Sequence, residues 1–244
     1  MVIKKLPFPR LAELVRKRYE QNPDAKRHGS FEEHDLLVGS FASIIAPNPR
    51  TGRLGIAAGY CHSIDHLVGG RLDNFDVENP ANLRKTATTP EEVERYLREL
   101  LAASKELSEE DQEEVVQAVL HHEGNNEQID LLPHHLLAQT LVEADRLANM
   151  ITTIPMRGAR FSLHLPLVDP LHFENDPAAN YRNPKSVLWD VANCASWGDR
   201  GGPYILRLPK ARELGAKYAA HLRQIIAWIR EDYMDTRIVS ENSN

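Results

Sequence analysis

Hydrophobic residues recur along most of the chain at the three- and four-residue spacing of amphipathic helices. In the N-terminal part this spacing predicts three helices, over Leu6–Tyr19, about Phe31–Ala46 and about Arg53–Val68. The breaker residues that follow the second and third of these stretches, Pro47 and the Gly69-Gly70 pair, are typical of helix ends. We therefore expect short helices joined by tight turns in this part of the chain.

The same spacing continues toward the C-terminus, after a polar and irregular stretch at residues 71–88. It predicts helices over about 90–103, 109–122, 132–151, 185–197 and 211–229. Residues 152–185 show weaker periodicity, and Phe161–Leu165 could pair as a short strand. The predicted fold class is all-α, with a helical core at residues 1–151 and a helical C-terminal extension, residues 152–244, packed on that core.

Composition argues against several classes of protein, including nucleic-acid-binding, disulfide-rich and membrane-spanning ones. Hydrophobic residues make up 42% of the chain and the formal net charge is −6, which argues against binding to duplex nucleic acid or to an anionic membrane surface. The chain has only two cysteines, Cys61 and Cys194, too few for a disulfide framework. It also contains no apolar stretch of the ~20 residues that a membrane span needs. These features predict a cytoplasmic protein.

Histidines and acids lie beside the apolar stripes of several predicted helices. His34 falls on the buried face of its helix, and His62, Asp65 and His66 share one flank of the next helix. Asp145 lies one turn after a buried leucine on the long helix, where a carboxylate needs a cation or hydrogen-bond donors. We expect His34, His62 and Asp145 to converge within a few ångströms.

Four sequence runs carry a resemblance to a known family. They are EHDLLVGSF at 33–41, LGIAAGYCHSI at 54–64, VLHHE at 119–123 and LVEADRL at 141–147. In order and spacing of histidine and aspartate, these runs resemble the HD superfamily of metal-dependent phosphohydrolases. The resemblance covers residues from about 30 to 151 and implies a bundle of the HD type.

The resemblance implies a four-ligand metal site at His34, His62, position 63 and Asp145. Position 63 is Ser63, whose neutral hydroxyl is a poor ligand for a divalent ion. Asp65 or His66 could supply the missing ligand, three ligands and waters could hold the ion, or the fold could be retained without the chemistry. We take His34, His62, His66 and Asp145 as the candidate ligands, and expect Ser63→Asp to strengthen metal binding if the rest of the site is intact.

The implied activity is hydrolysis of a phosphoester. The expected cofactor is a divalent ion (Mn, Fe, Mg, Ni or Zn), and the expected partner is a small phosphorylated ligand, with a nucleotide as the natural substrate class. His122 or Asp65 would move the proton. The cations that would neutralise the substrate phosphate are Arg84, Lys85 and Arg146.

Two other interpretations remain open. The chain could be a catalytically inactive HD-like domain that binds a nucleotide or a protein partner as a regulatory module. It could also be an unrelated helical binding protein, in which case the candidate ligands would lie scattered in space. The sequence leaves open whether the protein forms a homodimer.

Overall fold

The computed structural model describes residues 6–22, 30–68, 89–122, 126–161, 164–180, 183–199 and 205–235. Within these ranges the chain forms helices and no β-strand, apart from one isolated bridge between Asn180 and Asn183. The predicted all-α class is confirmed. The sequence left a short strand open at 161–165, but its described residues do not form one, and Phe161 is the last residue of a helix. Residues 162 and 163 lie outside the described ranges.

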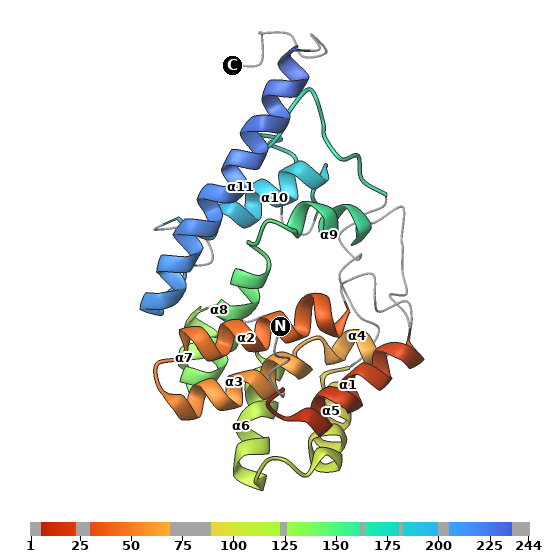
Figure 1. Cartoon of the computed structure of the whole chain (residues 1–244), viewed down its shortest axis with the longest axis vertical. Helices are drawn as coiled ribbons and strands as arrows, with labels where there is room; N and C mark the ends of the chain where they lie inside the picture. The colour runs from red at the N-terminus through yellow and green to blue at the C-terminus, as the bar shows by residue number, and fades with distance from the viewer. Residues whose placement is uncertain are drawn as a thin grey trace.

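The N-terminal part is a bundle of short helices around a shared apolar core (Figure 1). Its elements are α1 (Pro9–Gln21), a π-helical turn (Phe31–Asp35), α2 (Leu36–Ile45), α3 (Pro49–Cys61), α4 (Ile64–Val68), α5 (Pro90–Ser104), α6 (Glu109–Leu120), α7 (Asn126–Asp130) and α8 (His135–Ala148).

Side-chain caps start several of these helices, and α3 begins at Pro49, before the expected Arg53. The side chain of Asn48 accepts a hydrogen bond from the backbone N–H of Thr51 at the start of α3. Thr89 and Glu92 form a reciprocal capping box at the start of α5. These local bonds satisfy backbone N–H groups that have no partner within the helix.

The predicted third helix is wrong in one respect that matters for the site. It was expected to run unbroken from Arg53 to Val68, but α3 ends at Cys61 and α4 begins at Ile64. His62 and Ser63 form a turn between the two helices, and each is only 2% exposed. Consecutive residues on one straight helix point about 100° apart. The break allows both side chains to face the interior.

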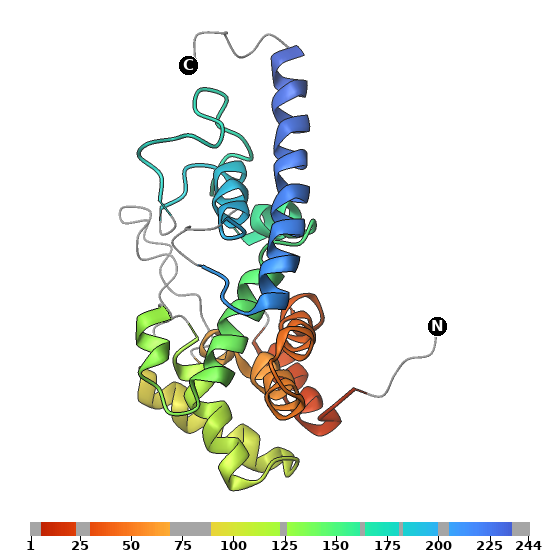
Figure 2. The same cartoon turned by 90° about the vertical axis from the view of Figure 1, so that its left-hand side faces the viewer.

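The C-terminal part contains α9 (Ile154–Phe161), α10 (Val187–Ser196) and the long α11 (Pro209–Asp235). Figures 1 and 2 show α8 leading out of the bundle toward this part, while α11 runs along α10 and reaches back to α2 and α8. Helix α11 is longer than the predicted 211–229. The division of the chain into domains at residue 151 stays a prediction.

A buried carboxylate joins the two parts. Glu143 of α8 is fully buried, and its two oxygens accept hydrogen bonds from the backbone N–H groups of Arg207 (2.8 Å) and Leu208 (2.9 Å). Burial, which outweighs these hydrogen bonds, raises the pKa of Glu143. The segment that leads into α11 is therefore held to the bundle by charge-assisted bonds.

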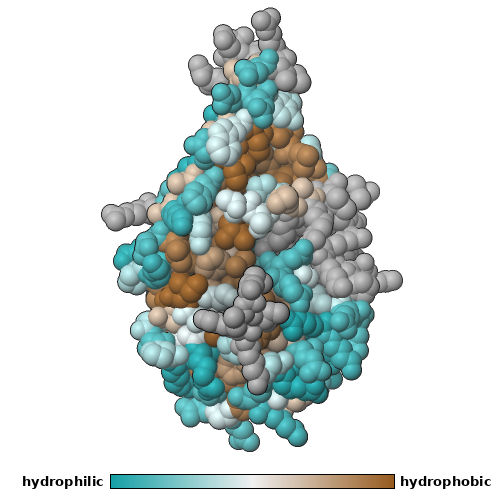
Figure 3. Space-filling view, in the orientation of Figure 1, coloured by the Kyte–Doolittle hydropathy of each residue, from teal (hydrophilic) through white to brown (hydrophobic). Residues whose placement is uncertain are grey.

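Apolar surface gathers in the C-terminal part. Figure 3 shows brown patches beside teal surface in the upper half of the molecule. The exposed large apolar side chains that follow residue 151 are Met156, Leu167, Leu171, Ile205, Trp228 and Met234. Among the described helices, none has both the length and the apolar character that a membrane crossing requires.

Candidate metal centre

Three side chains from separate elements meet inside the bundle. His34 comes from the π-helical turn before α2, His62 from the turn between α3 and α4, and Asp145 from α8. The Nε2 atom of His34 lies 3.0 Å from Nε2 of His62 and 3.2 Å from Oδ1 of Asp145. Nε2 of His62 lies 3.6 Å from the same carboxylate oxygen. The convergence expected from the sequence is confirmed.

The separations in this triangle suit a shared metal ion. Two ligands each about 2.1 Å from an ion lie about 3.4 Å apart in tetrahedral geometry and about 3.0 Å apart at neighbouring octahedral positions. The three observed separations run from 3.0 to 3.6 Å. Two imidazoles and a carboxylate are also a donor set suited to Zn, Fe, Mn or Ni. The site can therefore hold a divalent ion.

The other ring nitrogen of His62 sets its tautomer. Nδ1 lies 2.8 Å from the carbonyl oxygen of Gly59, to which its N–H donates, so in the neutral ring Nε2 carries a lone pair toward the centre. Burial, followed by the charge of His34, lowers the pKa of His62 well below its ordinary value. His62 is thus a neutral imidazole with the correct nitrogen presented to a metal.

Asp145 supplies the negative charge at the open side of the centre. Burial opposes its ionisation, but the hydrogen bond and charge of His34, with the charges of His62 and His122, outweigh burial and lower the pKa of Asp145. Its Oδ1 also accepts a hydrogen bond of 3.0 Å from the side-chain amide of Asn149. The Asp145 side chain keeps 27% exposure, against 1% for His34, so the centre reaches solvent on this side.

Asp35, which was not among the residues expected at the site, is a carboxylate directly behind the centre. Asp35 is fully buried and accepts hydrogen bonds from the hydroxyls of Tyr19 (2.8 Å) and Ser63 (2.9 Å). Its Oδ1 also lies 3.5 Å from Nδ1 of His62. Burial raises the pKa of Asp35, and this effect outweighs the lowering by the two hydrogen bonds. Its position directly after His34, a histidine on the predicted buried face of its helix, was the available signal.

The remaining predicted site residues lie at different places. The ring of His122, at the end of α6, is 5.8 Å from that of His62, measured between ring centroids. Asp65 and His66 lie in α4, 3.9 Å apart between Oδ2 and Nε2, and His66 does not join the ligand triangle. The predicted phosphate-binding residues are Arg146, which is buried, and Arg84 and Lys85, which lie outside the described residues.

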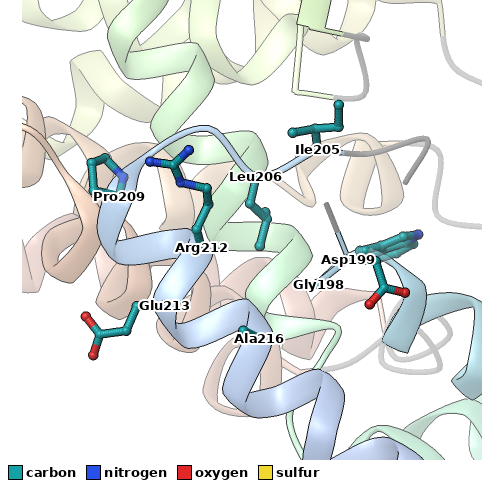
Figure 4. A pocket seen from close by; sticks show the side chains of 9 residues that line it. Gly198, Asp199, Ile205, Leu206, Pro209, Arg212, Glu213 and Ala216 are labelled. Carbon is teal, nitrogen blue, oxygen red and sulfur yellow. The ribbon is translucent and has the colours of Figure 1, made fainter. Parts of the chain in front are cut away.

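Two further features of the described surface lie apart from the three converging residues. Asp169, His172 and Asp176 also bring ligand atoms within 4.8 Å of one another, but His172 is 45% exposed and donates to Asp169 within a local turn. A cavity of about 700 Å³ lies between the end of α10 and the start of α11 (Figure 4). Arg212 and Glu213 at its edge point in different directions, and its lining includes none of the three converging residues.

Comparisons with known proteins add a fold and no activity. No protein-family model matches the sequence, and no curated protein matches it. The fold is similar to the crystal structure of a Lactobacillus plantarum protein that was a Northeast Structural Genomics target, with a TM-score of 0.58 and 14% sequence identity. The match covers 96% of this chain and 100% of that protein. At this identity the likeness concerns the fold alone.

Proposed function

We propose that this protein is a metal-dependent phosphohydrolase of the HD type, acting on a nucleotide or another small phosphoester. The observation that carries the proposal is the triangle of His34 Nε2, His62 Nε2 and Asp145 Oδ1, with separations of 3.0, 3.2 and 3.6 Å. These residues come from distant parts of the chain, in the order that the resemblance to the HD superfamily implies.

The alternative to a metal at this point is a proton, and the lone pairs explain why one of the two is needed. Nε2 of His62 and Oδ1 of Asp145 are both acceptors, and both face Nε2 of His34. Without a positive charge or a proton between them, these atoms would repel one another in a buried site. A proton on Nε2 of His34 would satisfy both acceptors through hydrogen bonds, whereas a divalent ion would satisfy them by coordination.

When bound, a divalent ion would polarise a phosphoryl oxygen and lower the pKa of a coordinated water. The protein itself supplies the groups that orient and move protons. Nδ1 of His122 donates to the carbonyl oxygen of Val119 at 2.6 Å, so Nε2 is the nitrogen that would accept or release a proton. The partly exposed side of Asp145 is where a substrate would reach the centre.

Of the three cations expected to bind the substrate phosphate, Arg146 is the one that lies within the described residues. The side chain of Arg146 is 6% exposed, and its charge acts on the buried carboxylate of Glu143. A buried guanidinium next to Glu143 suits a structural role as well as a phosphate-binding one. The phosphate-binding role of Arg146 stays a prediction.

A phosphate-release assay tests the proposed activity. Protein stripped with a chelator and reloaded with Mn, Fe, Ni, Zn or Mg should hydrolyse p-nitrophenyl phosphate or a nucleoside monophosphate only in the loaded form. Asp145→Ala should lose metal and activity together, because it removes the anionic ligand. Metal uptake with no hydrolysis of phosphomonoesters or phosphodiesters would contradict the proposed reaction.

The second candidate function is a catalytically inactive regulatory module. Ser63 favours it, since a hydroxyl stands where the resemblance expects a carboxylate ligand. In that case His34 and Asp145 would serve as a buried ion pair that stabilises the bundle. Elemental analysis separates the two candidates, because the module requires no stoichiometric metal.

A further inference from the structure

The hydroxyl of Ser63 links the proposed centre to the carboxylate behind it. Its Oγ lies 3.2 Å from Nε2 of His62, the nitrogen that faces the centre, and it donates its proton to Oδ1 of Asp35 at 2.9 Å. A hydroxyl has one proton, so the side of Ser63 that faces His62 presents only lone pairs. Ser63 is therefore placed to offer a metal ion a neutral oxygen ligand, and its hydrogen bond to Asp35 polarises that oxygen.

The charge of a bound divalent ion is the reason why the nearby acid Asp35 matters for metal binding. His34 and His62 are neutral as ligands, so Asp145 alone would set one negative charge against the two positive charges of a divalent ion. A net positive charge in a buried site is costly unless a nearby anion compensates it. Burial favours the protonated form of Asp35 in the metal-free protein, but a divalent ion nearby would favour its ionised form, which would then bring the second negative charge. Both oxygens of Asp35 already accept hydrogen bonds, from the hydroxyls of Tyr19 and Ser63.

We propose that Asp35 is a positioning residue that replaces, from behind Ser63 and His62, the carboxylate expected at position 63. The inference rests on the proposed metal site and identifies how that site works without the usual acid. Asp35 holds the Ser63 hydroxyl with its lone pairs toward the centre, and its Oδ1 lies 3.5 Å from the Nδ1 side of His62. Outer carboxylates of this kind orient metal-bound histidines and raise their affinity for the ion.

This arrangement reverses the effect expected for Ser63→Asp. From the sequence alone, adding a carboxylate at position 63 should strengthen metal binding. In the structure, the position of Ser63 Oγ is 2.9 Å from a carboxylate oxygen of Asp35. Ser63→Asp would place two carboxylates side by side in a buried site, and the repulsion should outweigh the gain. A carboxylate at position 63 should support metal binding only if Asp35 is replaced at the same time.

The test is a metal titration of the full chain and its variants, with zinc competed against a chromophoric chelator and with cobalt as an absorption probe. Asp35→Asn should bind zinc about 10- to 100-fold more weakly than the parent protein. Ser63→Ala should weaken binding in the same direction and alter the visible spectrum of bound cobalt, because it removes the oxygen through which Asp35 acts. A purely structural role for Asp35 would leave the cobalt spectrum of the folded variant unchanged.

Two control variants separate a local effect from a loss of packing. Tyr19→Phe removes the other hydroxyl bonded to Asp35, at Oδ2, on the side away from Ser63. It should weaken zinc binding less than Asp35→Asn does. Glu143→Gln alters another fully buried carboxylate, one that binds the backbone of Arg207 and Leu208. It should lower stability without changing the cobalt spectrum.

The exchange variant Asp35→Ser with Ser63→Asp gives the sharpest outcome. It should recover zinc affinity relative to Asp35→Asn and to Ser63→Asp alone, because one acid is again present. If Asp35→Asn does not fold, Ser63→Ala and the exchange variant decide. Parent protein that binds zinc, with Ser63→Ala and Asp35→Asn binding it equally well, would overturn the inference and leave the metal site standing. Parent protein that binds no divalent ion would overturn the proposed function itself.

Discussion

Gly59 of α3 lies directly against Gly39 of α2. A Cβ atom built on Gly59 would lie 2.3 Å from the backbone nitrogen of Gly39 and 2.5 Å from its Cα, so α2 and α3 touch backbone to backbone at this point. The carbonyl oxygen of Gly59 also accepts the Nδ1–H hydrogen bond of His62. The same residue therefore permits the helix crossing and orients one candidate ligand.

Gly59→Ala should consequently damage both stability and the metal site. The added methyl group meets backbone atoms that cannot rotate away. We therefore expect the free energy of unfolding to fall by at least about 1–3 kcal/mol. Urea denaturation and zinc titration measure the two effects. Gly158→Ala in α9 is the matched control: the nearest atom to its Cβ is Cγ1 of Val187, at an ordinary 3.4 Å. It should be neutral or stabilising by up to about 1 kcal/mol.

Asp145 and His66 should differ sharply in their effect on metal binding. Asp145 belongs to the converging triangle, whereas His66 lies in α4 outside it. We expect Asp145→Asn to weaken zinc binding by at least about 10-fold and His66→Gln to leave it unchanged. Isothermal titration on both variants checks this. Strong weakening by His66→Gln would show that His66 supplies the ligand missing at position 63.

Glu143 should anchor the C-terminal part to the bundle. Glu143→Ala leaves the backbone N–H groups of Arg207 and Leu208 without their acceptor in a buried place, which should cost about 1–3 kcal/mol. Equilibrium denaturation followed by Trp fluorescence measures the loss. Glu213→Ala is the control, since its pair with Lys210 is exposed and should contribute less than about 1 kcal/mol. Equal losses in the two variants would contradict the anchoring role.

Acid should destabilise the metal-free protein through His62. Burial lowers the pKa of this histidine in the folded state, while the unfolded chain titrates near 6.5. Below that pH the unfolded state binds a proton that the folded state does not, so the free energy of unfolding falls as the pH drops below 6.5 toward the lowered pKa. Thermal melts between about pH 7.5 and 5 should show this slope. His62→Gln should flatten it, and an unchanged slope would contradict the assignment.

The helical class and most helix positions followed from local chemistry. Apolar spacing and the capping residue Thr89 act within a few residues, so they can be read without knowing the fold. The same spacing marked His34, His62 and Asp145 as polar residues on or beside buried faces, and this was sufficient to predict that they converge. Their chemical role was implied by resemblance and stays a proposal.

Tertiary structure decided what the helical pattern could not. The apolar stripe continues through residues 62 and 63, so the break that turns both His62 and Ser63 inward is invisible to a periodicity argument. The importance of Asp35 was hidden for the same reason: its partners Tyr19 and Ser63 lie 16 and 28 residues away in the chain. Local sequence determines which residues form a helix and which face is apolar. Which polar groups then share one buried point depends on how helices cross, and only the packed structure shows it.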